Sequence, residues 1–512
     1  MSAGGGRGDG RTHIVVVGGG ITGLAAAYRL SLLAPEVAIT LIEADGRLGG
    51  KIVTEHVDGF VIEGGPDSFL ASKPRGVGLS EELGLAGRLQ GTTPQRRRAF
   101  VLRHGRLYDL PEGLTGLVPT RLGPMVRSGL ISPRGKARLA LDYVLPARRD
   151  GADESLAAFV RRRLGREVYD HLIEPLMAGI YGGDGERLSL AATFPHLRQG
   201  EVKHGGLIRG ALATNRPSGT TAPPTSVRTG FLTPENGLDE LVAALVRKLR
   251  ATGVQMILGQ AVTSIAIGHR ESGYRVAMGT GETLEVDGAI VATPAFAAAT
   301  ILEGMSACLS TELRGIPAVS SAIVSMGFPR ARVPHALDGH GYLVPRVEGR
   351  AVLACTWTSA KWAGRAPRGW VLLRVFIGRD GQEDVLQGSD DELVGLARHE
   401  IQETLRITAE PPVIRVHRWP AGMPQYTLGH LDRLAIIEEE LATFPGLALA
   451  GSAYRGVGLP DCIASGEASA EVVHAAATER MMQRRKDQGA PRLKATAVGN
   501  VGRDLAPTPV HV

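Results

Sequence analysis

The chain has 512 residues, of which 43% are hydrophobic, 21% are charged and 68 are glycine, with a formal net charge of +6. This is the composition of a globular protein long enough for two or three domains. The 3 cysteines form no Cys-x-x-Cys pair, which argues against structural zinc or a disulfide framework. The basic triplets 96–98 and 161–163 lack interleaved aromatic residues, so nucleic-acid binding is not expected.

Neither a secretory signal nor a membrane span is expected. Residues 1–11 are glycine-rich without an apolar segment, and no run reaches the roughly 18 uncharged apolar residues that a span needs. Residues 480–512 are charged and then rich in Pro, Gly and Thr. We therefore predict a cytoplasmic protein with flexible tails at 1–11 and 480–512.

The first chemical motif lies near the amino terminus. Residues 14–23 read IVVVGGGITG, a β-branched strand followed by Gly-x-Gly-x-x-Gly at 18–23. Its candidate dinucleotide-binding residues are Gly18, Gly20, Ile21, Thr22 and Gly23. This spacing predicts a tight turn, a close approach of backbone to a pyrophosphate, and a helix packed on the strand. Glu43 follows about 20 residues later, after a second strand-like run, where a carboxylate receives a ribose 2′-hydroxyl.

The residues after Glu43 distinguish between dinucleotides. Ala44, Arg47, Gly49, Gly50 and Lys51 extend the motif with a basic residue and a glycine pair, which a plain nicotinamide-binding domain does not need. Together with residues 18–23 they resemble the flavin-binding start of the amine oxidase, phytoene desaturase and protoporphyrinogen oxidase superfamily. The resemblance implies that these residues contact FAD.

Further segments resemble flavin-contacting parts of the porphyrinogen oxidase branch. They are the Gly-Gly-Pro-Asp turn (Gly64, Gly65, Pro66, Asp67), the strand residue Val262 near the adenine, and a glycine-rich turn before a helix (Gly451, Val457, Gly458, Leu459). A β-branched residue such as Val262 is equally typical of a core. We interpret Cys462 as a packing residue, so the resemblance implies non-covalent FAD.

Residues 114–197 show helical periodicity, with Ser155 as a candidate N-cap. Arg161 to Arg163 lie off the apolar stripe, and we favour a solvated helix face over membrane-surface contact by a basic amphipathic helix. Segments 159–165, 173–176 and 181–184 resemble the helical insert of the bacterial, soluble-type porphyrinogen oxidases. A second candidate N-cap, Asp239, precedes a helix at 240–250.

The predicted fold class is α/β combined with α+β. We expect a discontinuous Rossmann-type FAD domain (12–90, 228–297 and 430–477). An antiparallel-sheet substrate domain (91–113 and 298–429) and a helical insert with a connector (114–227) complete the chain.

The resemblance implies an FAD-dependent, oxygen-dependent six-electron oxidation of a porphyrinogen in haem biosynthesis. Hydride would pass from a meso carbon to the flavin N5, and hydrogen peroxide would be released. The substrate would be protoporphyrinogen IX or coproporphyrinogen III. Arg98, or its neighbours Arg96 and Arg97, would bind a propionate, and a surface arginine without a ligand is an equal alternative for this position. No spacing indicates a catalytic triad or a metal site, so we predict neither a catalytic residue nor a metal. Transient contact with other haem-pathway enzymes and with the membrane face stays open.

Three alternatives remain at this point. The chain is compatible with another flavin amine oxidase or a carotenoid desaturase, and with a non-catalytic carrier of the GDP-dissociation-inhibitor type. A nicotinamide dehydrogenase would leave Arg47 to Gly50 and the second glycine segment unexplained.

Overall fold

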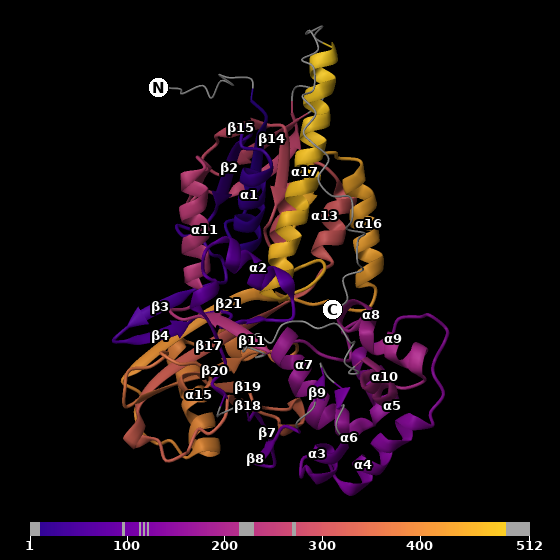
Figure 1. Cartoon of the computed structure of the whole chain (residues 1–512), viewed down its shortest axis with the longest axis vertical. Helices are drawn as coiled ribbons and strands as arrows, with labels where there is room; N and C mark the ends of the chain where they lie inside the picture. Colours follow the sequence, from indigo (N-terminus) through magenta and orange to yellow (C-terminus); the bar gives the residue numbers. More distant parts are fainter. Residues whose placement is uncertain are drawn as a thin grey trace.

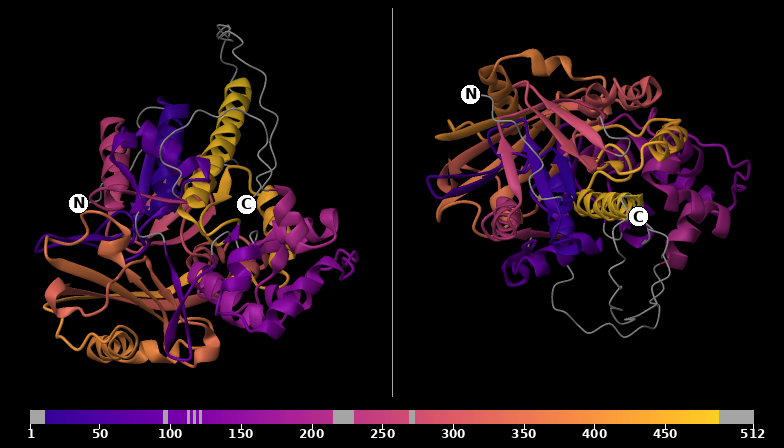
Figure 2. Two further views of the ribbon diagram at one scale, coloured as in Figure 1. Left: turned by 60° about the horizontal axis from the view of Figure 1, so that its bottom comes forward. Right: turned by 90° about the horizontal axis from the view of Figure 1, so that it is seen from above.

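The computed structural model describes residues 11–94, 98–111, 114–115, 118–119, 122–214, 230–268 and 273–487. These residues form a parallel sheet with flanking helices, an antiparallel sheet, and a group of helices beside it (Figure 1). Two further views show the same three bodies, with the helical group and the antiparallel sheet side by side (Figure 2).

The first body is built on a five-stranded parallel sheet of order β12-β2-β1-β16-β22. Along β1, alternate residues pack on opposite faces: Ile14 and Val16 on one, Val15 and Val17 on the other. The strands are β1 (His13–Val17), β2 (Ala38–Glu43), β12 (Gln255–Leu258), β16 (Gly288–Val291) and β22 (Leu447–Leu449).

Helices and a small sheet cover both faces of this sheet. On one face lie α1 (Ile21–Leu33), α2 (Pro74–Glu82), α11 (Asp239–Ala251) and α17 (Leu459–Asp487). The other face packs against α12 (Ala295–Leu302), α13 (Ala307–Arg314), α16 (His430–Ala442) and the antiparallel strands β13 (Val262–Ile267), β14 (Tyr274–Met278) and β15 (Thr283–Val286). Because both faces of the sheet are covered, its strands are apolar at consecutive positions and not only at alternate ones.

The second body is a seven-stranded sheet of order β21-β17-β20-β19-β18-β7-β8, in which only the β18–β7 pair is parallel. Its strands are β7 (Phe100–Arg103), β8 (Arg106–Asp109), β17 (Ala318–Pro329), β18 (Gly341–Leu343), β19 (Val352–Trp357), β20 (Trp370–Ile377) and β21 (Val413–Pro424). The helix α15 (Asp390–Leu405), which Ser389 and Glu392 cap, packs on one face. The short helix α14 (Thr358–Lys361) follows β19.

Other strands form small sheets that are separate from both large ones. β3 (Thr54–Val57) pairs with β4 (Phe60–Glu63), and β5 (Phe69–Leu70), β11 (Phe231–Pro234) and β6 (Leu89–Gly91) form a three-stranded sheet.

The third body is helical. It comprises α3 (Leu122–Arg127), α4 (Pro133–Ala140), α5 (Leu156–Leu164), α6 (Arg166–Val168), α7 (Glu174–Tyr181), α8 (Leu190–Thr193), α9 (Pro195–His204) and α10 (Leu207–Thr214). The Ser155 hydroxyl accepts a hydrogen bond from the Ala158 N–H, which confirms the predicted N-cap of α5. The stretch predicted to be helical from 114 instead begins with two short strands, β9 (Leu114–Thr115) and β10 (Val118–Pro119).

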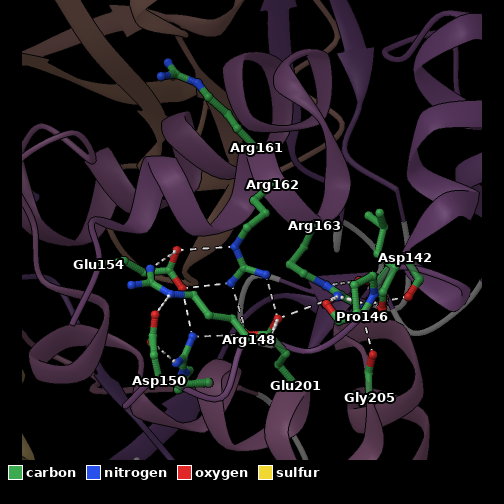
Figure 3. Close-up of polar contacts among 12 residues, drawn as sticks. Asp142, Pro146, Arg148, Asp150, Glu154, Arg161, Arg162, Arg163, Glu201 and Gly205 are labelled. Atoms are coloured by element: carbon green, nitrogen blue, oxygen red, sulfur yellow. Dashed lines mark hydrogen bonds and ion pairs between the residues drawn. The ribbon is translucent and has the colours of Figure 1, made fainter. Parts of the chain in front are cut away.

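The prediction of a solvated arginine face on α5 is wrong for Arg163, which points into polar groups of the chain itself (Figure 3). Arg161 and Arg162 keep 36% and 32% of their side chains exposed. Arg163 is 0% exposed, and its Nε lies 2.6 Å from Asp142 Oδ1. Arg162 binds Glu154 at 2.8 Å and Glu201 at 2.7 Å. Because α9 and the segment around Asp142 pack against α5, carboxylates of the chain itself meet these guanidinium charges.

Two other expectations also need correction. Asp239 is the first residue of α11 rather than its N-cap, since the N–H groups of Leu238 and Asp239 bind the side chains of Glu63 (2.9 Å) and Thr54 (3.2 Å). The caps therefore come from the β3–β4 hairpin. α17 continues to Asp487, so the expected tail cannot begin at 480.

The packing also bears on the boundary between the two sheets. α12 and α13 belong to the buried cluster of the parallel sheet, together with Val15, Val17 and Val291. The expected boundary at 298 falls inside α12, and we place it after α13, near Ile316.

Candidate cofactor site

The carboxyl ends of the parallel strands bring the predicted glycine segments to one edge of the sheet. From β1 the sheet continues to β2 on one side and to β16 on the other, and such a switch point is where open α/β sheets bind ligands. The Gly18 N–H donates to the Ile42 carbonyl at 2.8 Å, and the Ala450 N–H donates to the Val291 carbonyl at 3.0 Å. The segments after β1, β2, β16 and β22 are thus neighbours.

The first glycine turn leads directly into α1. Gly18 has φ +105°, and a Cβ there would lie 2.8 Å from the Ala292 carbonyl oxygen. A Cβ on Gly23 would lie 1.9 Å from the Gly18 carbonyl oxygen, so helix and turn pack as the motif predicts. Gly20 is the N-cap of α1 and offers no side-chain hydrogen bond, which leaves the N–H groups of the first turn, at Ile21 and Thr22, facing a prospective anion.

Glu43 ends β2 beside this turn. Its carboxylate accepts hydrogen bonds from the N–H groups of Gly19 and Asp45 (2.9 Å to the latter). Ala44 follows and is exposed. The Gln260 N–H donates to the Glu43 carbonyl at 3.1 Å, which brings the start of β13 and the buried Val262 to the same corner. Val262 belongs to the core cluster of Val17 and Ile42.

The segment from Arg47 to Lys51 lies against the first glycine turn. The Gly49 N–H donates to the Gly19 carbonyl at 2.8 Å, and a Cβ on Gly50 would lie 3.0 Å from the Cα of Gly20. Arg47 donates to the carbonyls of Gly50 (2.6 Å) and Ile52 (3.1 Å), which fixes this segment. The Lys51 ammonium donates to the Gly422 carbonyl, and burial lowers the pKa of Lys51.

The Gly-Gly-Pro-Asp turn follows β4 and is packed against protein groups. A Cβ on Gly65 would lie 2.0 Å from the Lys51 carbonyl oxygen, and one on Gly64 would collide with the His417 ring. The Gly64 carbonyl accepts a hydrogen bond from the Trp419 indole at 2.7 Å. These glycines are therefore required by contacts within the chain.

Asp67, after Pro66, ties this turn to the antiparallel sheet. Its carboxylate lies 3.0 Å from the Lys361 ammonium, 3.1 Å from the Trp362 indole nitrogen and 3.5 Å from the Arg374 guanidinium. Burial alone would raise the pKa of Asp67, but Lys361 and Arg374 outweigh burial and hold that pKa well below its ordinary value.

The second glycine segment precedes α17. The Gly451 N–H donates to Ser465 Oγ at 3.0 Å, and the Gly458 N–H donates to Asp461 Oδ2 at 3.2 Å. Val457 and Leu459 beside it are half-buried. A Cβ on Gly466 would lie 2.2 Å from the Thr22 carbonyl oxygen, so α17 crosses α1 at van der Waals contact. The structure thus brings both glycine segments together.

Cys462 is buried in the same cluster as Ile21 and Leu24, in agreement with the packing role predicted for it. Burial raises the pKa of its thiol to about 11.

Arg98 is not brought to this edge. It precedes β7 in the seven-stranded sheet, its side chain is 52% exposed, and it binds the carboxylates of Asp109 (2.8 Å) and Asp338 (2.5 Å). Its alternatives Arg96 and Arg97 lie outside the described residues.

Several residues at this edge escaped the sequence reasoning. Trp419 and Gly422 lie on β21, more than 350 residues from Gly64 and Lys51, to which they are hydrogen-bonded. Lys361 reaches Asp67 from α14. No spacing in the sequence connects these positions.

Comparisons with known proteins agree on one family. Residues 21–474 match the family of flavin-containing amine oxidoreductases. The coproporphyrinogen III oxidase of Bacillus subtilis is 40% identical over 467 residues, covering 90% of this chain and 97% of that protein. The coproporphyrinogen III oxidase of Staphylococcus aureus is 33% identical (90% and 98% covered), and the chloroplastic protoporphyrinogen oxidase of Nicotiana tabacum is 31% identical (88% and 83% covered).

Solved structures agree. An Exiguobacterium protein provisionally assigned as a protoporphyrinogen oxidase has a TM-score of 0.79 and 34% identity, covering 91% of this chain and 99% of that one. Cyclohexylamine oxidase from Brevibacterium oxydans has a TM-score of 0.63 at 18% identity, covering 92% and 99%, and shares the fold. Among the described helices, none is long and apolar enough to cross a membrane.

The residues at the carboxyl edge fit a flavin dinucleotide. The α1 N-terminus lacks a side-chain cap, which leaves donors for a pyrophosphate. The Thr293 hydroxyl, next to Ala292 at the glycine turn, is buried without a hydrogen-bond partner among the described residues. The chain therefore belongs to the flavin-containing amine oxidoreductase family, and its cofactor is FAD.

Proposed function

We propose that this FAD-dependent oxidoreductase converts coproporphyrinogen III to coproporphyrin III in haem biosynthesis. The observation that carries the proposal is the 40% identity to the Bacillus subtilis coproporphyrinogen III oxidase across 97% of that protein, which includes the helical body. Protoporphyrinogen IX is the alternative substrate, supported by the relative from Nicotiana tabacum.

Bound FAD would supply the two-electron acceptor for each of three oxidation steps, with dioxygen as the final oxidant and hydrogen peroxide as the product. We propose that the chain holds this cofactor at the carboxyl edge of the parallel sheet. The proposed contacts are Gly18, Gly20, Ile21, Thr22, Gly23, Glu43, Ala44, Arg47, Gly49, Gly50, Lys51, Gly64, Gly65, Pro66, Asp67, Val262, Gly451, Val457, Gly458 and Leu459.

Positive potential at this edge would favour an electron-rich ligand. The amino-terminal end of α17 carries the positive end of the helix dipole. The buried Lys51 ammonium is near enough to Cys462, in the first turn of α17, to influence the pKa of that thiol. Both features favour negative charge in the same place.

We also propose a cytoplasmic location for the enzyme. Dioxygen, other haem-pathway enzymes and the face of the cytoplasmic membrane stay as predicted partners, and Arg98 stays the predicted contact for a substrate propionate.

The test gives the purified protein each of the two porphyrinogens in air. Porphyrin fluorescence and the flavin absorbance of the same sample are recorded together, with a sample lacking protein for the non-enzymatic rate. We expect a yellow protein that is faster on coproporphyrinogen III. Greater speed on protoporphyrinogen IX would reverse the substrate assignment, and a yellow protein with no gain above the non-enzymatic rate would overturn the function.

A further inference from the structure

Tyr426 lies where the three bodies of the molecule meet. It follows β21 of the antiparallel sheet and is 1% exposed. Its carbonyl accepts the Ser189 N–H at 2.8 Å, and its ring lies edge-on to Tyr181 with centroids 6.1 Å apart, both contacts coming from the helical body. Its hydroxyl reaches the segment between β22 and α17, in the body that holds the cofactor.

The hydroxyl holds that segment at two points. It donates to the Ser452 carbonyl at 2.6 Å and accepts from the Gly456 N–H at 2.7 Å. Burial raises the pKa of Tyr426 well above its ordinary value, so the hydroxyl keeps the proton that it donates. Gly456 has φ +124°, a conformation that side-chain-bearing residues rarely adopt. Glycine permits this turn, and the Tyr426 hydroxyl binds the segment at both of its ends, Ser452 and Gly456.

The ring of Tyr426 is itself fixed. It stacks on the His430 imidazole with centroids 4.2 Å apart and an interplanar angle of 13°. His430 Nε2 lies 2.9 Å from the Tyr454 carbonyl, so the stacked partner also contacts the segment. Because stacking on His430 fixes the Tyr426 ring, the Tyr426 hydroxyl is held at one position relative to residues 452–456.

The anchored segment borders the cofactor edge. Ala450, just before it, bonds to Val291 at the carboxyl end of β16, beside Ala292 and the Gly18 turn. After it, α17 begins and crosses α1 at Gly466 and Thr22. A displacement of residues 452–456 would therefore move the first turn of α17 relative to the first turn of α1.

We propose that Tyr426 is a positioning residue for the flavin, whose hydroxyl sets the path of residues 452–456 and hence the placement of the α17 N-terminus against the cofactor. The inference rests on the cofactor site proposed above and is independent of which substrate is oxidised. Because Tyr426 also contacts the helical body, it links that body to the segment that precedes α17.

The test compares Tyr426→Phe with a matched control, Tyr454→Phe. Phe at 426 keeps the stacked ring and removes the hydroxyl. Tyr454 lies in the same segment, but its side chain packs in the core cluster of α12, α13 and α16, on the sheet face opposite α1 and α17, and its hydroxyl anchors no backbone group of the described chain. Apoprotein is titrated with FAD, and the visible absorption maxima and reduction potential of the reconstituted protein are measured, with far-ultraviolet circular dichroism as the check on folding.

We expect Tyr426→Phe to weaken FAD binding about fivefold, as loss of one or two buried hydrogen bonds implies, and to shift the absorption maxima and the reduction potential. Tyr454→Phe should match the wild type in FAD affinity, absorption maxima and reduction potential. Unchanged maxima and potential in a folded Tyr426→Phe, even with a lower melting temperature, would overturn the proposal, as would equal shifts in both variants.

If Tyr426→Phe does not fold, 3,5-difluorotyrosine incorporated at position 426 keeps the ring and both hydrogen bonds while changing the strength of the hydroxyl as a donor. A shifted flavin spectrum supports the proposal, and an unchanged spectrum overturns it. These measurements need no porphyrinogen, so failure of the proposed substrate assignment would leave this inference standing, and the reverse also holds.

Discussion

At the scale of single residues, burial and partners decide what a charge does. Arg163 and Arg166 are three positions apart, yet Arg163 is fully buried against Asp142 while Arg166 is 83% exposed beside Asp170. A buried charge that loses its partner remains desolvated, whereas an exposed charge is screened by water. The two arginines should therefore respond very differently to the same change.

Arg163→Met should lower the free energy of unfolding by about 3 kcal/mol or more, because Asp142 would stay buried without its cation. Arg166→Met is the control and should change the free energy of unfolding by less than about 0.5 kcal/mol. Urea denaturation of the holoprotein measures both. Equal effects would mean that burial does not govern this pair.

Glu63 gives a pH-dependent expectation. Burial, opposed by hydrogen bonds from Thr54 and Leu238 and by Arg365, raises the pKa of Glu63 to about 7. A raised pKa in the folded state stabilises the protein while Glu63 is protonated. That contribution is lost as the pH rises from the ordinary glutamate range through about 7.

The melting temperature of wild type should therefore fall relative to Glu63→Gln between about pH 5 and pH 8, by the equivalent of up to about 3 kcal/mol. Differential scanning calorimetry at several pH values checks this. A difference between the two proteins that is independent of pH would contradict it.

Arg98 carries the prediction for substrate binding. If its guanidinium holds a propionate, Arg98→Gln should raise KM for the porphyrinogen several-fold while kcat and the flavin spectrum stay unchanged. Steady-state fluorescence assays measure both constants. An unchanged KM would assign Arg98 to its ion pairs with Asp109 and Asp338 alone.

At the scale of elements, one close crossing of helices shapes the cofactor edge. Gly466 of α17 meets the Thr22 carbonyl of α1 with no room for a Cβ. In α15, by contrast, a Cβ on Gly395 would meet nothing within 4 Å. Substitution by alanine should therefore push α17 away from α1 at position 466 and should displace nothing at position 395.

Gly466→Ala should lower the free energy of unfolding by about 1–3 kcal/mol and weaken FAD binding, because the backbone of α1 must move. Gly395→Ala should be neutral or stabilising by up to about 1 kcal/mol, as expected for alanine in an open helical position. Thermal denaturation and FAD titration test both variants. Wild-type affinity in Gly466→Ala would show that the crossing does not shape the site.

At the scale of the whole molecule, a few polar contacts join the two sheets across the cofactor edge. Asp67, after β4, is held by Lys361 of α14 and Arg374 of β20, and the Gly64 carbonyl by Trp419 of β21. Because the Asp67 carboxylate is ionised and buried, its removal would leave two cations without their shared anion.

Asp67→Asn should lower the free energy of unfolding by about 2–4 kcal/mol. Because the pKa of Asp67 is lowered, the stabilisation is present above the ordinary aspartate range and is lost only as the pH falls through the depressed value. Melting temperatures of wild type and variant should therefore differ by a constant amount from pH 8 to pH 5. A difference that disappears by pH 5 would contradict this ionisation state.

The sequence by itself determined the local elements and the family. β1, the Gly18 turn, α1 and the Ser155 cap are fixed by neighbouring residues, because strand burial, positive φ and capping depend on spacing along the chain. Motifs along the whole chain identified the flavin-dependent family, which the comparisons confirm.

Only the tertiary structure decided which distant groups meet. Glu201 neutralises Arg162 from 39 positions away, Glu63 caps α11 in place of Asp239, and Tyr426 anchors the segment after β22. Such partners are set by how helices and sheets pack, and packing satisfies buried charges and hydrogen bonds with whatever side chain the fold brings near. Periodicity and motif spacing therefore do not predict which distant side chains will be paired.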